Sequence, residues 1–495
     1  MLKTAVGAGT RGVVLAAALL VGCSGSADSR EGHGEGKPAD KPNVLLVTLD
    51  TTRVDHLSCY APRQGRLTPS FDALAADGIR FALAIAQSPA TPMSHASILT
   101  GLYPYQHGVR VIAADAGYHL SPTIPTLASV LQRHGWETAA FVSAFTVSEY
   151  YGFEQGFETF DNGLRQDADT IIYEQDGRRR WKQSVHQRRA DATTDQALAW
   201  LRSGQRPFLL WVHYWDPHDR MVLPPAEVLR RFVTPGMKPN SPQWKRAVYR
   251  AEVHFVDAQF GRLLAALRAA GEYDKTLIVV VADHGQGLGQ HGWWAHRLPY
   301  QEDLHVPLIL RVPDWPRGRV VPELVRTIDI YPTVLDVLGL PAPRPVAGLS
   351  LRPLVFGQTE TPRLAYAEVL NKYDLNSPVV QKRPKDDLVY CALDQTWKLI
   401  YRYSYPDDSE LFNLAVDPQE LHNRYRQQPD QVRRLKAILD GHNAYVTAPF
   451  GSGMPEAEAL RALESLGYVG GTDDEAGEPN SPAGSRPATA PAERP

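Results

Sequence analysis

Short apolar runs alternate with longer amphipathic stretches along most of the chain. In five of the runs nearly every position is apolar: 44–49, 138–142, 208–212, 277–282 and 306–312. Runs of this length, separated by helical lengths, indicate strands that are covered on both faces, as in a mostly parallel sheet.

The stretches between the runs space their apolar residues as helices do. They are 70–77, 126–134, 189–202 and 246–270. This alternation predicts an α/β fold, a mostly parallel sheet sandwiched by helices. Beyond residue 363 the pattern changes: 388–390 and 397–403 predict antiparallel strands, and 431–439 a helix. We therefore expect an α/β domain over 42–355 and a smaller C-terminal α+β subdomain over 356–470.

The N-terminus looks like a bacterial lipoprotein signal. Lys3 and Arg11 precede a small and apolar run over 12–22 that ends at Cys23. The run is too short to span a bilayer as a helix, so 1–22 is predicted to be removed during export. Lipid on Cys23 would then anchor the chain to a membrane, at the bacterial periplasm or cell surface. An ordinary cleaved secretory signal is the alternative.

The segments on either side of the folded part are polar and poor in large apolar residues. Residues 23–41 predict a flexible tether, and the Pro-rich 471–495 predicts a disordered tail.

The 52 basic and 55 acidic residues leave a charge of -3, so no global positive field favours nucleic acid as a partner. Cys59 and Cys391 could form a disulfide or remain two buried thiols.

Polar residues follow three of the predicted strands. Ligands of open α/β sheets bind outside the carboxyl ends of the strands. A single Asp after a strand is more often a helix cap or a turn residue. Three strands that bring Asp and His to one edge would instead create a site with the composition of a metal centre. The residues are Asp50 after the first run, His213, Asp216 and His218 after the third, and Asp283 and His284 after the fourth.

A further element is predicted over 91–101. Thr91 can cap a helix whose first position is Pro92, and Gly101 can end it in the left-handed conformation. The same geometry would aim the Thr91 hydroxyl and the first free N–H groups at one point, where an anionic ester could bind. A nearby divalent cation would make the hydroxyl a nucleophile by lowering its pKa.

Several motifs together resemble the sulfatases of the alkaline phosphatase superfamily, and the resemblance covers nearly the whole folded part. They are 42–50, 94–104, 281–285, 289–292, 325–333 and 410–418. The resemblance implies an alkaline phosphatase-like fold.

The nucleophile motif departs from that family. Typical sulfatases place there a cysteine or serine that is converted to formylglycine, with an Arg four residues later; this chain has Thr91 and His95. The usual second aspartate after Asp50 is Thr51, and 141–145 replaces the usual Lys-Trp-His segment. Because threonine cannot give the aldehyde, the site is similar to the threonine-nucleophile branch, which includes phosphodiesterases, phosphoethanolamine transferases and lipoteichoic acid synthases.

The resemblance implies roles for individual residues. Asp50, Thr91, Asp283 and His284 match ligands of one divalent metal ion, Mn, Zn or Ca. Thr91 would also be the nucleophile, with His218 and His296 as catalytic partners that bind the transferred group. His218 and His296 could alternatively hold a second metal with Asp216. His95, His213 and Asp216 are candidate substrate-binding residues, whereas His107, His254 and His305 are expected to be structural.

These assignments predict a hydrolase of sulfate or phosphate esters that acts through a covalent Thr91 ester. A threonine ester has no geminal hydroxyl and must be opened by a second attack, which favours phosphate, whereas the family favours sulfate. The expected substrate is a sulfated or phosphorylated glycan, lipid or small molecule. A transferase that moves a phosphoryl-linked head group, and a catalytically silent surface lipoprotein, are the alternatives.

Overall fold

The computed structural model describes residues 41–62, 65–114, 117–163, 172–175, 179–182, 187–204, 207–218, 222–375, 377–445, 457–465 and 468. All of them belong to one compact unit that begins at Lys41. The predicted signal over 1–22, the lipidation site Cys23, the tether up to residue 40 and the tail 471–495 lie outside the described residues. Within those ranges, the structure has no helix that is long and apolar enough to cross a membrane.

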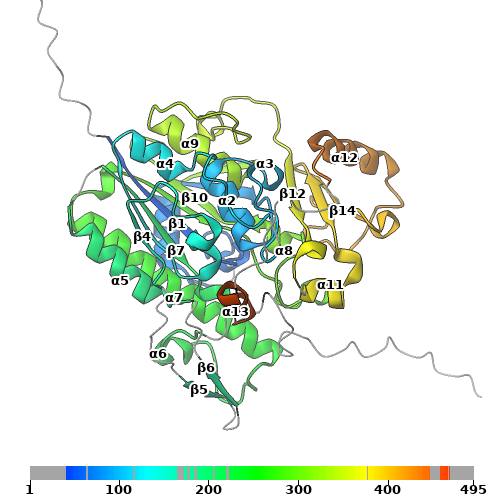
Figure 1. Ribbon diagram of the computed structural model, residues 1–495, viewed down its shortest axis with the longest axis horizontal. Helices are drawn as coiled ribbons and strands as arrows, with labels where there is room; N and C mark the ends of the chain where they lie inside the picture. Colours follow the sequence, from blue (N-terminus) through cyan, green and yellow to red (C-terminus); the bar gives the residue numbers. More distant parts are fainter. Residues whose placement is uncertain are drawn as a thin grey trace, which may run out of the picture. The chain divides into compact units, whose positions relative to one another are not determined.

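A nine-stranded sheet forms the centre of the unit (Figure 1). Its strands lie in the order β11 (Arg319–Arg326), β2 (Ile79–Ile85), β10 (Leu308–Arg311), β8 (Thr276–Ala282), β1 (Asn43–Leu49), β7 (Phe208–Tyr214), β3 (Glu137–Phe141) and β4 (Thr159–Asp161), with β9 (His305–Val306) beside β2. β10 and β9 run opposite to the other strands. The mostly parallel sheet is therefore confirmed.

Four of the five apolar runs are single parallel strands, and the fifth is not. Pro307 divides the run 306–312 into β9 and β10, both antiparallel to their neighbours. Proline has no N–H to donate to a ladder, so the strand pairing is interrupted there. β2, β4 and β11 complete the sheet and contain partly exposed positions, which is why they do not stand out as apolar runs.

Helices cover the sheet where the spacing of apolar residues predicts them. Those predicted are α1 (Pro69–Ala76), α4 (Leu127–Arg133), α5 (Ala190–Leu201) and α7 (Pro242–Ala269). α7 begins four residues earlier than expected, because the Ser241 side chain accepts a hydrogen bond from the Trp244 amide and Pro242 occupies the first helical position. α5 packs against α7, and Figure 1 shows both on one side of the sheet, with α2 (Thr91–Thr100), α4 and α9 (Ile330–Val337) on the other.

A second, antiparallel sheet forms the C-terminal part of the unit, as predicted. Its strands follow one another as β12 (Ala365–Val369), β13 (Val389–Leu393), β14 (Trp397–Arg402) and β15 (Glu410–Asn413). α12 (Pro429–His442) packs on it through the buried Leu435 and Leu439. Shorter elements are α3 (Pro104–His107), α6 (Ala226–Leu229), α8 (Gln301–Leu304), α10 (Arg352–Val355), α11 (Pro378–Lys382), α13 (Ala457–Ser465), β5 (Ile172–Gln175) and β6 (Arg179–Lys182).

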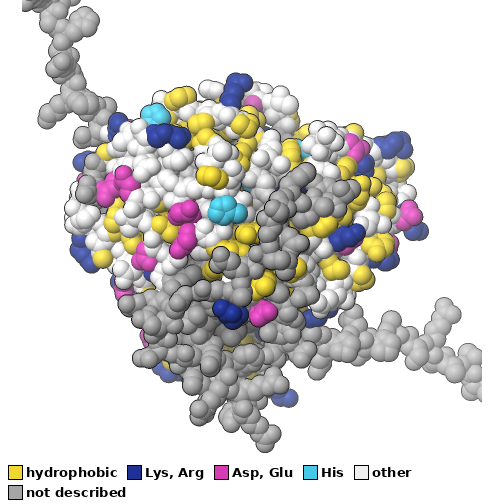
Figure 2. Space-filling view, in the orientation of Figure 1, with side chains coloured by type: hydrophobic (Ala, Val, Ile, Leu, Met, Phe, Trp, Pro, Cys, Tyr) yellow, Lys and Arg dark blue, Asp and Glu magenta, His cyan; other side chains and the backbone are white. Residues whose placement is uncertain are grey.

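Cys59 and Cys391 are both free thiols, so the disulfide considered for them is not present. On the face drawn in Figure 2, basic and acidic side chains of the described residues are interspersed.

Candidate active site

Three neighbouring strands end at the same level and deliver the polar residues to one edge. Leu49 of β1 is paired in register with Ala282 of β8 and with Tyr214 of β7. The Asp50 amide donates to the Tyr214 carbonyl at 2.8 Å, and the Asp283 amide donates to the Leu49 carbonyl at 3.3 Å. The two aspartates therefore begin side by side at the carboxyl ends of β1 and β8.

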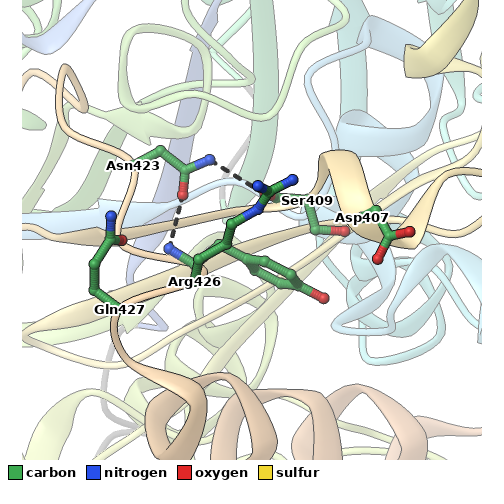
Figure 3. Close-up of a pocket in the computed structure, with 6 residues that line it drawn as sticks. Asp407, Ser409, Asn423, Arg426 and Gln427 are labelled. Carbon is green, nitrogen blue, oxygen red and sulfur yellow. Dashed lines mark hydrogen bonds between the residues drawn. The ribbon is translucent and has the colours of Figure 1, made fainter.

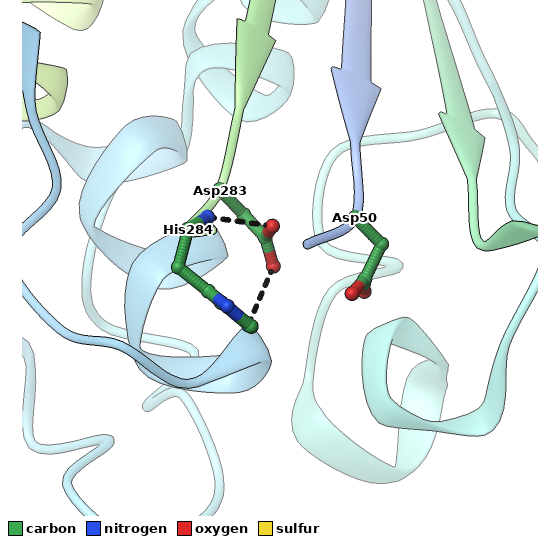
Figure 4. Close-up of side chains that lie close together, drawn as sticks. All are labelled: Asp50, Asp283 and His284. Atoms are coloured by element: carbon green, nitrogen blue, oxygen red, sulfur yellow. Dashed lines mark hydrogen bonds and ion pairs between the residues drawn. The ribbon is translucent and has the colours of Figure 1, made fainter. Parts of the chain in front are cut away.

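Asp50, Asp283 and His284 form a buried cluster in which the potential ligand atoms all lie within 4.8 Å of one another (Figure 4). Asp283 Oδ1 accepts hydrogen bonds from the amides of His284 (2.7 Å) and Thr51 (3.1 Å). Its Oδ2 lies 3.4 Å from Nε2 of His284. Backbone contacts thus fix one oxygen of Asp283 and leave the other facing the cluster.

The cluster has the chemistry of a cation site. Asp50 Oδ1 and Asp283 Oδ2 are buried and have no hydrogen-bond partner among the described residues. Burial raises the pKa of both carboxyl groups well above the ordinary value, and for Asp50 the neighbouring Asp283 adds to the effect. A divalent cation held by the two carboxylates would offset both the cost of burying their charges and the repulsion between them, so the residues fit a metal.

His284 is oriented as a metal-binding histidine is. Its Nδ1 donates to the Gly285 carbonyl at 2.9 Å, which leaves a lone pair on Nε2. Nε2 faces the cluster, at 3.2 Å from Thr91 Oγ1. Burial lowers the pKa of His284 well below 6.5, so the ring is neutral, as a ligand must be.

The Thr91 hydroxyl lies at the cluster, as the sequence predicts, but Thr91 does not cap the helix. α2 begins at Thr91 itself, and the capping position is Ala90. Thr91 Oγ1 lies 3.4 Å from Asp50 Oδ2 and 3.2 Å from His284 Nε2, and among the described residues no side chain caps the start of α2. Gly101 ends α2 with φ 69°, in the left-handed region as expected.

His95 and His213 lie beneath the cluster, with ring centroids 5.0 Å apart. His95 Nδ1 donates to the Thr91 carbonyl at 2.9 Å, and burial lowers the pKa of His95 to about 4. His213 accepts from the Ser143 amide at Nδ1, so its Nε2 carries the proton, 3.4 Å from Asp50 Oδ2. Both rings are fully buried. The structure thus brings them to the cluster, and their substrate-binding roles stay predictions.

His218 and His296 face each other on the other side of Thr91, with 3.2 Å between their Nε2 atoms. His296 Nδ1 donates to the Pro89 carbonyl at 3.0 Å, so its Nε2 accepts and the Nε2 of His218 donates in the contact between them. Asp216 is engaged elsewhere: its Oδ1 accepts from the amide of Ala190, the first residue of α5. Burial raises the pKa of Asp216 to about 7. Its Oδ2 is buried and has no hydrogen-bond partner among the described residues, and the role of Asp216 in substrate binding or in a second metal site stays a prediction.

Tyr468 belongs to the site and was not predicted. Its hydroxyl lies 3.3 Å from Thr91 Oγ1 and 2.9 Å from His218 Nε2. Tyr468 follows α13, near the point where the sequence becomes low in apolar content, and no motif there marks it. The contact joins residues 377 positions apart, a distance that no local pattern reveals.

A pocket elsewhere on the surface differs in chemistry (Figure 3). It lies in the C-terminal part and is lined by Asp407, Ser409, Asn423, Tyr425, Arg426 and Gln427. The Asn423 side chain there accepts from the Tyr425 amide and donates to the Ser409 carbonyl. These contacts stabilise a loop, and the described groups with metal-binding geometry are at the strand ends instead.

Comparison with known proteins identifies sulfatases as relatives of this chain. The sulfatase family model matches residues 42–340, and the model of the N-sulphoglucosamine sulphohydrolase C-terminal region matches 289–442. An N-acetylglucosamine-6-O-sulfatase of Bacteroides thetaiotaomicron is 26% identical over 475 residues, which cover 77% of this chain and 82% of the relative. Arylsulfatase K of Bos taurus is 25% identical, covering 86% and 87%.

Solved structures share the fold. The phosphonate monoester hydrolase of Agrobacterium radiobacter superimposes with a TM-score of 0.63 at 22% identity, over 81% of this chain and 95% of that one. The predicted alkaline phosphatase-like architecture is confirmed by this likeness. Since the sulfatase model spans more than half of the sequence, the chain belongs to the sulfatase family.

Proposed function

We propose that this chain is a metal-dependent ester hydrolase of the sulfatase family in which Thr91 is the nucleophile. The observation that carries the proposal is the position of Thr91 Oγ1, 3.4 Å from Asp50 Oδ2 and 3.2 Å from His284 Nε2, at a cluster with two unpartnered carboxylate oxygens. A hydroxyl that served only to cap a helix would face the helix amides.

Asp50, Thr91, Asp283 and His284 would hold the cation. When bound, a manganese, zinc or calcium ion would lower the pKa of the Thr91 hydroxyl and offset the charge of the two carboxylates. Mixed carboxylate, hydroxyl and imidazole ligands suit manganese or zinc better than calcium, which prefers oxygen ligands alone.

The residues of the chain supply the rest of the reaction. Thr91 Oγ1 attacks the phosphorus or sulfur in line, the ester oxygen leaves, and a covalent Thr91 ester forms. The N-terminus of α2 offers positive potential to the bound anion. His218, whose Nε2 carries the proton that faces His296, would donate a hydrogen bond or a proton to the leaving oxygen, and the Nε2 lone pair of His296 would orient that donor. Water then hydrolyses the Thr91 ester.

Two observations bear on the substrate in different ways. Sulfate esters, and sulfated glycans in particular, are favoured by family membership and by the name of the Bacteroides thetaiotaomicron relative. Phosphate esters are the second candidate, because a threonine at the nucleophile position cannot expel sulfate in the way formylglycine does. Attack of water on a phosphorylated threonine is the simpler second step.

Turnover by the metal-loaded protein tests the proposal. The panel contains aryl sulfate, phosphate monoester, phosphate diester and phosphonate substrates, each with and without an alcohol acceptor that would reveal transferase activity. We expect hydrolysis of at least one class, with kcat/KM lowered at least about 1,000-fold in Thr91→Ala. Thr100→Ala is the matched control on the same helix, since its hydroxyl only bonds the Ala96 carbonyl. Full activity of Thr91→Ala would contradict the proposal.

We also propose export and lipid anchoring at Cys23, which rests on the sequence alone. Expression of the full chain in a bacterial host should place the wild-type protein in the membrane fraction. Cys23→Ser should release it into the soluble exported fraction, and an equal distribution of the two proteins would contradict the anchor.

A further inference from the structure

The Tyr468 hydroxyl touches the reactive oxygen of the proposed nucleophile. It lies 3.3 Å from Thr91 Oγ1 and 2.9 Å from His218 Nε2, and the Tyr468 side chain is buried. Its ring is surrounded by other rings of the site: those of Trp215, His218 and His296 lie with centroids 5.6 to 6.5 Å away. Both the ring and the hydroxyl of Tyr468 thus contact residues of the site.

α13 holds this tyrosine in place. The helix buries Ala462 and Leu463 completely and contacts the short helix η3 (Phe145–Val147). The Tyr468 amide donates to the Leu463 carbonyl at 2.9 Å, so the residue is tied to the end of the helix. The packing of α13 therefore determines where the Tyr468 hydroxyl lies.

The donors and acceptors around Thr91 Oγ1 assign a direction to the contact. Asp50 Oδ2 is an acceptor, and His284 Nε2 is an acceptor because Nδ1 of the same ring donates to Gly285. The one proton of the Thr91 hydroxyl serves one of these acceptors. His218 Nε2 also lies at the phenol, but it carries a proton, because it faces the Nε2 lone pair of His296. The phenol therefore does not donate to His218, and with Asp50 ionised in the metal-loaded site the Tyr468 O–H donates to a lone pair of Oγ1.

We propose that Tyr468 is a catalytic residue whose hydroxyl donates a hydrogen bond to Thr91 Oγ1 while that oxygen carries negative charge. The inference rests on the proposed function of Thr91. Its consequence is greatest in the second step, when water attacks the phosphorus or sulfur and the bond to Oγ1 breaks. Oγ1 departs with the electron pair, and the phenol stabilises this developing oxyanion without losing its own proton. The proton that the attacking water loses then restores the Thr91 hydroxyl. His218 Nε2 lies at the phenol oxygen and can donate to it in turn.

The test compares wild type with Tyr468→Phe, which keeps the ring and removes only the hydroxyl. In the metal-loaded protein, with an aryl ester that wild type hydrolyses, we expect kcat to fall about 100-fold. KM should fall as well, because loss of the second step lets the covalent ester accumulate. A burst of released phenol and a phosphoryl or sulfuryl group on the peptide that contains Thr91 should accompany the change. Tyr445→Phe is the matched control, since Tyr445 packs against Tyr390 in the C-terminal sheet.

A binding measurement gives a second readout that needs no turnover. Vanadate forms a five-coordinate adduct with a serine or threonine oxygen, which resembles the transition state of either step. Calorimetric titration of the metal-loaded proteins should show about 10-fold weaker vanadate binding in Tyr468→Phe than in wild type or Tyr445→Phe, as expected for the loss of one hydrogen bond to a charged oxygen.

The outcomes separate the two proposals. If Thr91→Ala keeps full activity, the proposed function fails. If Thr91→Ala is inactive but Tyr468→Phe matches wild type in kcat, burst and vanadate affinity, the role of Tyr468 alone is wrong. A rise in kcat/KM of Tyr468→Phe would also overturn it, because the tyrosine would then obstruct the site. Where no ester is turned over, equal vanadate affinity of wild type and Tyr468→Phe overturns it.

Discussion

The buried carboxylates at the strand ends differ from those that join the two sheets. Asp50 and Asp329 are both fully buried, but Asp329 is surrounded by donors. Its two oxygens accept from the side chains of Arg326 and Arg363, at 2.7 and 2.8 Å, and from the Leu349 amide at 2.9 Å. Asp50 has Asp283 as its neighbour, and one of its oxygens lacks a hydrogen-bond partner among the described residues.

The same contrast holds for Glu368 of β12, which receives two hydrogen bonds of 2.6 Å from Arg110. Burial alone would lower the pKa of the Arg110 guanidinium, but Glu368 raises it. A carboxylate that faces guanidinium groups can hold two parts of the molecule together. Two buried carboxylates that face each other without a positive group lower the stability of the fold. Such a pair is expected where a bound ligand supplies the positive charge.

Removing Asp329 should have the largest effect on stability. Asp329→Ala leaves Arg326 and Arg363 buried without their shared counterion, so the free energy of unfolding should fall by about 3–5 kcal/mol. Urea denaturation monitored by circular dichroism measures it. Asp430→Ala on α12 is the control, because this exposed carboxylate pairs only at the surface with Arg433, and less than about 1 kcal/mol should be lost. Equal losses would show that burial does not distinguish the two pairs.

Adding a metal should stabilise the protein through the strand-end carboxylates. Mn²⁺ or Zn²⁺ at 100 times its dissociation constant should raise the free energy of unfolding by about 2.7 kcal/mol over the chelator-treated protein. Differential scanning calorimetry of both forms measures the shift. Asp283→Asn should abolish it, whereas Asp216→Asn should retain it, because the Asp216 carboxylate bonds to α5. A shift that survives in Asp283→Asn would place the metal elsewhere.

Neutralising one strand-end carboxylate should stabilise the metal-free protein. Asp50→Asn keeps the shape of the side chain and ends its repulsion with Asp283, so we expect a gain of about 1–2 kcal/mol in chelator. Asp257→Asn is the matched substitution: Asp257 is also buried, but it accepts from the amides of Ser70 and Phe71 at the start of α1 and should lose stability. Parallel urea titrations compare the signs, and a loss in Asp50→Asn would contradict the contrast.

The buried, neutral side chain of His107 should have the smallest effect on the free energy of unfolding, and only at acidic pH. Burial lowers the pKa of His107 to about 3, and its Nε2 lies 3.0 Å from Ser97 Oγ. Below pH 6.5 the unfolded chain binds a proton there that the folded chain does not, so stability falls with pH until about pH 3. At pH 5.5 this group should contribute about 1 kcal/mol of the loss. His107→Gln should flatten the slope of stability against pH between 6.5 and 5; an unchanged slope would contradict this.

The sheet could be predicted where burial is uniform along a strand. β1, β7 and β8 are buried at every position and appear in the sequence as continuous apolar runs. β11 was missed because exposed residues and Pro322 interrupt its pattern. The direction of β10 was wrong because an apolar run carries no information on orientation.

The site residues could be predicted from the sequence where they directly follow the ends of adjacent strands. Asp50, Asp283 and His284 directly follow two adjacent parallel strands, so the fold brings them together. Asp216 also follows a strand, yet its carboxylate turns to the amide of Ala190, a choice that depends on where α5 begins. Tyr468 could not be found, since its place depends on how α13 packs.

The contact between Thr91 and Tyr468 has a consequence for biosynthesis. Asp50 comes from the first strand of the unit and Tyr468 from the described residue nearest the C-terminus. A ribosome must therefore release almost the whole polypeptide before the surroundings of the threonine hydroxyl are complete. Proteolytic trimming upstream of α13 would return a finished molecule to the same incomplete condition.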